Sequence, residues 1–406
     1  MSGSATDRPS TAGADGRAAD RPIPFHRPSI GPGERQAVLE VLDSGWLTTG
    51  GRTLAFEAAV AEAVGVRHAV AVNSATAALH LALEALGIGP GDEVVVPTYT
   101  FASSGEVVRY LGARPRLADV DPLTLNLTAE TLAPQLRPET RAIQVVHFGG
   151  RVAEMGPILE LARERGVAVV EDAAHAIPAS RGGVQAGAFG AAGALSFYAT
   201  KTVTTGEGGM LVTDDEAIAE RARVMRLHGI SRDAWKRYQA GGSWYYEIED
   251  VGFKYNLTDL AAAIGLVQLE RAGELRLARE RVAGWYAAAF AAAPDDLAGL
   301  VELPPSPGPD EVAAWHLYPL RLRADLTARR GAVIERLAGE GIGTSVHFIP
   351  LHLHPYYQRT YGYRPEDLPI ARREYEREIS LPIYPDLGEA DVERVVAALG
   401  RALAVA

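Results

Sequence analysis

Lys201 is the residue of this sequence whose neighbours point most directly to a catalytic role. It lies in segment 196–201, just after the strand-like run 194–197, and it precedes the glycine-rich turn 206–209. Asp172 stands after an earlier apolar run, residues 167–170. A lysine amine can form a Schiff base with a cofactor aldehyde, and an acid can keep a pyridine nitrogen protonated so that the ring accepts electrons. This combination, in this order, predicts an enzyme that uses pyridoxal phosphate (PLP).

Each of these residues also has a simpler interpretation. Lys201 could be a surface lysine, and Asp172 could cap a helix, which is the interpretation we would favour if it stood alone. A carboxylate just past a buried strand end costs free energy unless it is paired, and a protonated pyridine nitrogen would provide the pair. Ser196 would add a hydroxyl near the phosphate or the lysine. The PLP interpretation therefore depends on the three residues occurring together.

Segment 74–78 joins a predicted strand to a predicted helix and could bind a phosphate. Backbone N–H groups and hydroxyls at a helix start suit an anion, although a plain helix N-cap explains the segment equally well. Phe101 follows another predicted strand and could stack on the pyridine ring. For a single phenylalanine, a place in the core is the more common role.

Three histidines, His347, His352 and His354, lie in a segment that also holds Tyr356 and Tyr357. A metal site is conceivable, but no ordered set of carboxylates or cysteines accompanies the histidines, and we predict no metal centre. An anionic, sugar-like ligand suits this cluster better. A structural role explains any single histidine about as well.

Short β-rich runs alternate with helical stretches from residue 68 onward. This alternation predicts an α/β fold with a largely parallel sheet and helices on both faces. Ligands of such sheets bind just beyond the C-terminal ends of the strands, where Ser74, His147, Asp172 and Ser196 fall. The predicted strands are 68–73, 93–96, 142–147, 167–171, 194–197 and 209–213, and a helix is predicted over 75–86.

Outside this region, helical spacing over residues 38–42 predicts a helix that stops at Ser44 and Gly45. A long helix is predicted over 258–288, and the proline-rich segment 303–309 predicts a linker or surface loop. We therefore predict a disordered tail at 1–21, a large domain at 22–288 that includes the long helix, and a smaller C-terminal α+β domain at 289–406.

Composition narrows the class of protein. The chain has 406 residues, no cysteine, and a net charge of -11. This charge argues against nucleic-acid binding, and no apolar run approaches the roughly 20 residues of a membrane span. The lack of cysteine excludes disulfides and thiol nucleophiles and fits a cytoplasmic protein.

Taken in order, many segments resemble the DegT/DnrJ/EryC1/StrS family of sugar aminotransferases, within fold type I of the PLP-dependent transferases. The resemblance covers nearly the whole chain from about residue 24. Lys201 argues against the family's sugar dehydratases, which carry histidine at this position. The segments that carry the resemblance are 44–50, 74–79, 91–97, 171–176, 196–201, 206–209, 226–229, 254–259, 315–318 and 341–344.

The resemblance implies a role for each candidate residue. Lys201 would be the Schiff-base lysine and Asp172 the partner of the pyridine nitrogen. His175, where many relatives have glutamine, would lie beside the ring, which completes the expected catalytic set. The cofactor would also contact Ser74, Ala75, Thr76, Ala77, Phe101, Ser196 and, from a neighbouring subunit, Asn256. Substrate contacts are expected at Tyr99, His316, His347 and Tyr357.

The resemblance also implies a homodimer with shared active sites that moves an amino group from L-glutamate to a nucleotide-linked keto-sugar. Pyridoxamine phosphate would carry the amine between the two half-reactions. Ala75, where many relatives have glycine, and Asn256, where many have arginine, favour amination at C4, as in the UDP-4-amino-4-deoxy-L-arabinose type. The aminosugar would serve an antibiotic or a surface polysaccharide. A 3-keto-sugar aminotransferase, an amino-acid aminotransferase and a non-enzymatic regulator on the same scaffold stay open.

Overall fold

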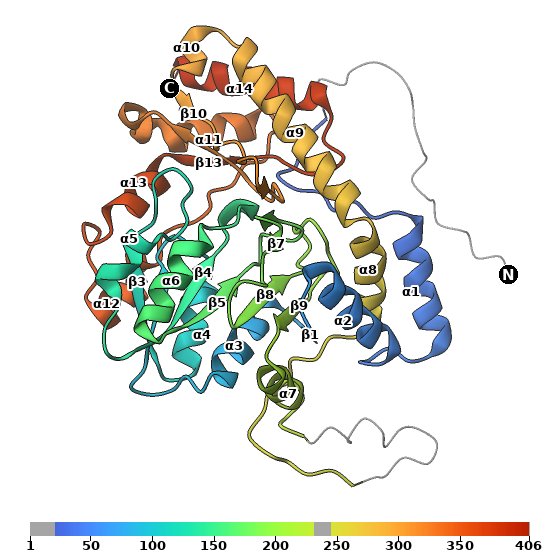
Figure 1. Ribbon diagram of the computed structural model, residues 1–406. Coiled ribbons are helices and arrows are strands. Elements are labelled where there is room, and N and C mark those ends of the chain that lie inside the picture. Colours follow the sequence, from blue (N-terminus) through green and yellow to red (C-terminus); the bar gives the residue numbers. More distant parts are fainter. Residues whose placement is uncertain (1–20, 231–244, 406) are drawn as a thin grey trace, which may run out of the picture.

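The computed structural model describes residues 21–230 and 245–405. Figure 1 shows a central sheet with helices around it, and a smaller C-terminal unit above it. The predicted tail at residues 1–21 lies outside the described residues except for Arg21. Within the described ranges, no helix is long and apolar enough to cross a membrane.

The central sheet has seven strands in the order β1-β9-β8-β5-β4-β2-β3. Strands β3, β2, β4, β5 and β8 are parallel to one another, whereas β9 is antiparallel to both β8 and β1. The predicted α/β class with a mostly parallel sheet is therefore confirmed. The strands are β1 His68–Val72, β2 Glu93–Pro97, β3 Arg114–Ala118, β4 Thr140–Val146, β5 Ala168–Asp172, β8 Ala192–Ser196 and β9 Gly209–Thr213.

Both faces of this sheet are covered by helices, because alternate residues of each strand point to opposite sides and both sets are apolar. Ala69 and Ala71 of β1 join one core, and Val70 and Val72 join the other. The first core includes α2 (Gly51–Val64), α6 (Met155–Arg165) and α8 (Asp259–Glu270). The second includes α3 (Ala75–Ala85), α4 (Ala102–Tyr110) and α7 (Glu216–Met225).

The structure divides the long helix that the sequence predicts over residues 258–288. Helix α8 ends at Glu270 and α9 (Ala272–Ala292) begins two residues later. Between them, Arg271 has φ -92° and ψ 1°, and its Nη1 donates to Glu34 Oε1 at 2.7 Å. Glu34 lies in α1 (Pro32–Ser44), and Gly45 is the C-cap of this helix, so α1 ends where the sequence predicts. The apolar spacing continues across Arg271, so the sequence pattern does not reveal the break.

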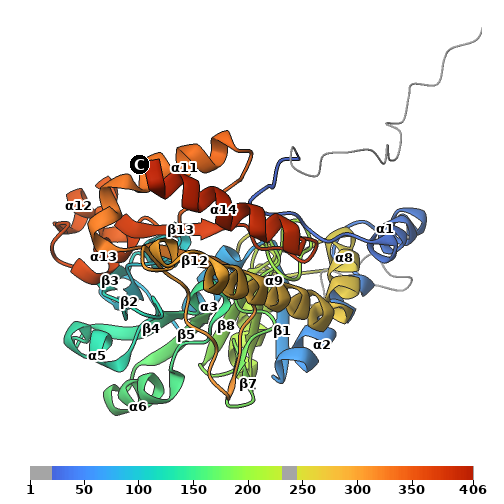
Figure 2. The same ribbon diagram turned by 90° about the horizontal axis from the view of Figure 1, so that it is seen from above.

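A third core lies in the C-terminal unit, where α9 and α14 pack side by side (Figure 2). Its antiparallel sheet has the order β10-β12-β13. Val282 and Phe290 of α9 belong to this core, together with Ile23. The predicted boundary between residues 288 and 289 thus falls inside α9. The other elements here are β10 Val301–Glu302, β12 Tyr318–Leu322, α11 Arg330–Gly339, α12 Pro355–Tyr361, α13 Pro369–Arg377, β13 Glu378–Leu381 and α14 Glu389–Val405.

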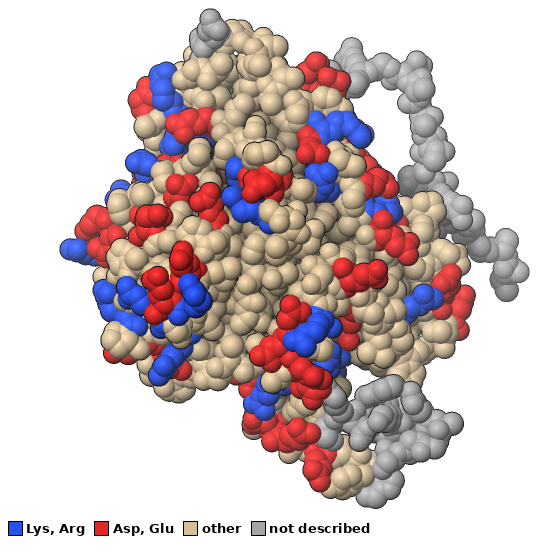
Figure 3. Space-filling view, viewed as in Figure 1, with Lys and Arg blue, Asp and Glu red and all other residues tan. Residues whose placement is uncertain are grey.

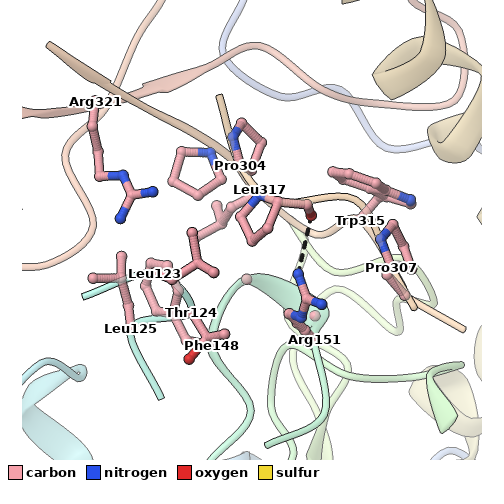
Figure 4. Close-up of a pocket in the computed structure, with 15 residues that line it drawn as sticks. Leu123, Thr124, Leu125, Phe148, Arg151, Pro304, Pro307, Trp315, Leu317 and Arg321 are labelled. Atoms are coloured by element: carbon pink, nitrogen blue, oxygen red, sulfur yellow. Dashed lines mark hydrogen bonds between the residues drawn. The ribbon is translucent and has the colours of Figure 1, made fainter. Parts of the chain in front are cut away.

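The proline-rich segment 303–309 belongs to the C-terminal part of the chain but lies against the large domain. It borders a small pocket in which Arg151 Nη1 donates to Pro305 O at 3.0 Å (Figure 4). Strand β11 (Glu311–Val312) then pairs with β6 (Ser180–Arg181) of the large domain. The pocket has a volume of about 50 Å³, too small for a cofactor or a sugar.

Gly209, the first residue of β9, lets helix α3 approach the sheet closely. A Cβ at this position would lie 2.2 Å from the carbonyl carbon of Ser74. We expect Gly209→Ala to destabilise the protein by about 1–3 kcal/mol, because backbone must move to admit the methyl group. Urea unfolding followed by circular dichroism would measure the loss.

The matched control is Gly284→Ala in α9, where no atom lies within 4 Å of the added methyl group. Alanine has the higher helix propensity, so this change should be neutral or stabilise by up to about 1 kcal/mol. Equal unfolding free energies for the two variants would contradict the close approach at Gly209.

Candidate active site

A cavity of about 410 Å³ lies at the C-terminal edge of the central sheet, where the sequence predicts a ligand site. The large domain lines one side of it, and Phe348 and Ile383 of the C-terminal unit line the other. Ten of the predicted site residues meet here: Ser74, Ala75, Thr76, Phe101, Asp172, His175, Ser196, Lys201, His316 and His347.

Asp172, the last residue of β5, is buried at 5% exposure. Its Oδ2 accepts a hydrogen bond from Ser104 Oγ at 2.9 Å, and its Oδ1 accepts from Ala174 N at 3.2 Å. Burial raises the pKa of Asp172, although these two donors and Lys201 oppose the rise. Asp172 lines the cavity, and a buried carboxylate is stabilised by a cationic partner. A protonated pyridine nitrogen fits that need.

Lys201 is the amine of the cavity. Its Nζ lies 3.5 Å from His316 Nε2, and burial lowers the pKa of Lys201 to about 8. The Asp172 carboxylate raises the pKa of Lys201, and the Arg279 cation lowers it. A lysine with a lowered pKa is partly a free amine near neutral pH, which is the form that attacks an aldehyde and exchanges protons.

His175 follows β5 and is held as one neutral tautomer. Its Nδ1 accepts a hydrogen bond from Gly149 N at 3.3 Å, and burial keeps the pKa of His175 well below its usual value. The proton of the neutral ring therefore lies on Nε2. The structure thus offers an N–H donor beside Lys201 and Asp172, which suits the ring oxygen of PLP.

The first turn of α3 provides the features of an anion site. Ser74 is the N-cap and its Oγ accepts from Ala77 N at 3.1 Å, while Ala75 and Thr76 line the cavity. The N–H groups at a helix start and the nearby Ser196 hydroxyl suit a phosphate. Ala77 is buried behind this turn, and its N–H group already binds Ser74.

Four predicted residues do not line this cavity: Ala77, Tyr99, Tyr357 and Asn256. Tyr99 is fully buried in a cluster with Phe148, because it points to the opposite side of the chain from Thr100. Tyr357 packs against Gly105, whose missing side chain leaves room for the Tyr357 hydroxyl group. Asn256 donates to Thr49 Oγ1 at 2.8 Å, outside the cavity.

The other histidines that the sequence singles out are also placed elsewhere. His147 Nε2 lies 2.8 Å from Glu171 Oε2, and both side chains are fully buried away from the cavity. His352 Nδ1 lies 2.8 Å from Thr98 Oγ1, and His354 Nε2 lies 3.3 Å from Ile349 O. These contacts give each of the three a structural role.

Four residues that sequence analysis did not identify support the site. His26 lines the cavity and its Nε2 lies 2.9 Å from Ala199 O. Thr100 Oγ1 lies 2.7 Å from Ser104 Oγ, which extends the hydrogen-bond chain from Asp172. Arg279 of α9 is the fourth of these residues. A single sequence contains no signal for them, because their partners lie far away along the chain.

Arg279 of α9 is buried at 1% exposure and makes contacts with backbone carbonyls. Its Nη1 donates to Ile383 O at 2.9 Å and to Trp315 O at 3.3 Å, and its Nη2 donates to Thr200 O at 3.4 Å. One side chain thus connects the long helix to the turn before Lys201 and to the C-terminal unit.

Ser104 should strengthen cofactor binding through Asp172. Ser104→Ala removes a donor to the ionised carboxylate, so we expect the pKa of Asp172 to rise further and the Kd for PLP to increase by about tenfold. Fluorescence titration of the apoprotein with PLP would measure this. Thr100→Val leaves the Ser104–Asp172 bond in place and should weaken binding less. Unchanged affinity in Ser104→Ala would contradict this role.

Residues 28–400 match the DegT/DnrJ/EryC1/StrS aminotransferase family. The chain is 48% identical over 381 residues to the spore coat polysaccharide biosynthesis protein SpsC of Bacillus subtilis, covering 93% of this chain and 96% of SpsC. The aminotransferase TlmJ from Streptoalloteichus hindustanus has a TM-score of 0.86 and 37% identity, covering 95% of this chain and 100% of TlmJ. The PMP form of Spr1654 from Streptococcus pneumoniae, described as a sugar aminotransferase, has a TM-score of 0.87 and 30% identity, covering 94% of this chain and 98% of that one.

Proposed function

Because the chain belongs to the DegT/DnrJ/EryC1/StrS aminotransferase family, we propose that it moves an amino group from L-glutamate to C4 of a nucleotide-linked keto-sugar. Family membership makes the protein a PLP-dependent sugar aminotransferase. The donor, the nucleotide and the carbon that receives the amine are our inference. TDP-4-keto-6-deoxyglucose is the first substrate to test.

One observation carries the proposal: a buried lysine amine and a buried carboxylate line the same cavity at the sheet edge. When bound, PLP supplies an aldehyde that captures amines and a ring that accepts electrons. Lys201 would bind the aldehyde and, once displaced by a substrate amine, move a proton at the substrate carbon. Asp172 would keep the ring nitrogen protonated. His175 and the first turn of α3 would hold the ring oxygen and the phosphate.

The residues that we propose to bind the sugar lie on the wall of the cavity that the C-terminal unit forms. His316, His347 and Phe348 line the cavity from the C-terminal unit and offer rings and ring nitrogens that suit a hydroxyl-rich ligand. The likeness to SpsC, named for spore coat polysaccharide biosynthesis, supports a surface polysaccharide as the destination. Ala75 and Asn256, which differ from many relatives, support C4 over C3.

A homodimer is part of the proposal, because the cavity has features that a second subunit would complete. Arginine is a common partner of carboxylates, and glutamate carries two of them. No arginine among the described residues lines the cavity. Phe101 and Tyr198 line the cavity yet are 60% and 46% exposed. Asn256, outside its own cavity, would reach the cofactor phosphate of the neighbouring subunit.

Product formation tests the reaction. The protein, PLP, L-glutamate and TDP-4-keto-6-deoxyglucose should together give a sugar nucleotide with a new amine, detected by mass spectrometry and absent without glutamate. Lys201→Ala should give no product and lack the absorbance of lysine-bound cofactor, because the proton-transferring amine is gone. Full turnover by that variant would refute the assignment. If the wild type consumes glutamate but leaves this sugar unchanged, the proposed substrate is wrong. UDP-linked sugars and 3-keto sugars are then the next substrates to test.

Mixed dimers test the shared site. Lys201→Ala and Asn256→Asp chains should each be inactive alone, the second because a carboxylate would repel the cofactor phosphate. After subunit exchange, half of the dimers pair one chain of each kind, and one of their two sites then has both intact residues. We therefore expect about a quarter of wild-type activity to return, given twofold symmetry. If Asn256 serves its own subunit's site, no activity returns.

A further inference from the structure

The C-terminal unit places three polar side chains in a row that ends at the cavity. Glu378 and Ser380 are two residues apart in β13, so they lie on the same face of the strand. Ser345 pairs with Ser380 through backbone hydrogen bonds of 3.2 and 2.8 Å, which holds the segment before His347 against β13. On the other face of β13, Ile379 and Leu381 pack in the core.

A continuous hydrogen-bond chain joins these three side chains. Ser380 Oγ lies 2.5 Å from Glu378 Oε1, and His347 Nδ1 lies 2.9 Å from Ser380 Oγ. His347 N also donates to Glu378 Oε2 at 2.9 Å. The serine hydroxyl can donate in only one of these two directions at a time, so the direction of its O–H bond decides the role of His347 Nδ1.

The His347 ring is fixed in the cavity wall. It stacks on Phe25 with centroids 5.5 Å apart and meets Phe348 edge-on at 5.0 Å. With Nδ1 bound to Ser380, Nε2 is the ring nitrogen left for a ligand, and no described residue bonds to it. Burial and the nearby Lys201 lower the pKa of His347 to about 4, so the ring stays neutral and carries one proton.

Glu378 can exchange a proton near neutral pH. It is fully buried, and burial raises the pKa of Glu378 to about 8 although Ser380, His347 N, Arg330 and Arg321 oppose the rise. No ion pair reaches it from the described residues: Arg321 lies 3.4 Å from Glu374, and Arg330 donates to Tyr375 O. The charged and titratable groups around it are Arg321 of β12, Arg330 of α11, Glu374 of α13, Tyr99 and His347.

We propose that Glu378, Ser380 and His347 form a proton relay that sets which ring nitrogen of His347 carries the proton. With Glu378 ionised, Ser380 donates to Glu378, His347 Nδ1–H donates to Ser380, and Nε2 faces the cavity as an acceptor. With Glu378 protonated, Glu378 donates to Ser380, Ser380 donates to Nδ1, and Nε2–H faces the cavity as a donor.

The states with Glu378 ionised and with Glu378 protonated differ by one proton. The relay passes this proton along without changing the total. When Nε2 gives its proton to a ligand base, Nδ1 takes the Ser380 proton, Ser380 takes the Glu378 proton, and Glu378 becomes the anion. The ring remains neutral before and after the transfer. Glu378 and Ser380 are therefore positioning residues that act on the ligand through His347.

The identity of the ligand rests on the proposed function, whereas the relay does not. A keto-sugar nucleotide presents hydroxyl groups, and the ionised state of the relay offers Nε2 as their acceptor. We therefore expect the ionised state, favoured above about pH 8, to bind the sugar productively. Glutamate consumption should depend less on the relay.

The first test reads the tautomer directly. In ¹⁵N-histidine NMR of the holoenzyme, with His347→Asn identifying the signal, the proton should lie on Nε2 at about pH 6.5 and on Nδ1 at about pH 9.5. In Glu378→Gln the amide donates to Ser380 at every pH, so the proton should stay on Nε2. Ser345→Ala is the matched control and should behave as the wild type. A wild-type tautomer that does not change, or a Glu378→Gln variant that still switches, would overturn the relay.

The second test separates the relay from the reaction. In the wild type, kcat/KM of the sugar half-reaction should rise from pH 6.5 to 9. In Glu378→Gln this rise should be smaller by about fivefold. The glutamate half-reaction of the variant should not change to a similar extent. Equal pH profiles would refute the link to sugar binding. If the tautomer switches but no keto-sugar receives an amine, the relay stands and the proposed function fails.

Discussion

The active site depends on the burial of a cation that has no carboxylate partner among the described residues. The guanidinium of Arg279 is surrounded by carbonyl groups from the turn before Lys201, from the Trp315–His316 segment and from Ile383. A buried charge is costly unless its hydrogen bonds are satisfied, so these carbonyls must stay where they are. Arg279 lies on α9, which reaches from a core of the large domain to the core of the C-terminal unit, and it thereby fixes the C-terminal unit relative to the lysine.

The same cation shapes the electrostatics of the cavity. Burial and Arg279 both favour the neutral amine of Lys201, while Asp172 alone opposes them. The histidines around the amine are also kept neutral by burial, with Lys201 adding to the effect for His175, His316 and His347. Neutral rings can donate and accept hydrogen bonds at fixed nitrogens, so the cavity offers directed polar groups rather than a set of competing positive charges.

Local sequence patterns predicted most of the large domain because its strands are short, apolar runs between helical stretches. Strand β9 has the predicted bounds, and β1, β2, β4, β5 and β8 differ from the predicted strands by one or two residues at their ends. Strand β3 was not predicted. The break at Arg271 was not predictable, because the apolar spacing continues across it and Glu34, which Arg271 contacts there, lies in a helix far away along the chain. Tyr99 stands beside Thr100, which lines the cavity, and Tyr357 lies in the segment that follows His347. Their rings nevertheless point into the core, which no spacing rule revealed.

By itself, the sequence determined the family, the α/β class and the pair Lys201 and Asp172, because these depend on residue types at fixed places relative to strand ends. Only the tertiary structure decided which partners make those residues work. Ser104 reaches Asp172 from α4, Arg279 reaches the lysine turn from α9, and Glu378 reaches the cavity through Ser380 and His347. Burial and hydrogen bonding set the protonation of each group, and both arise from segments that meet only when the chain is folded.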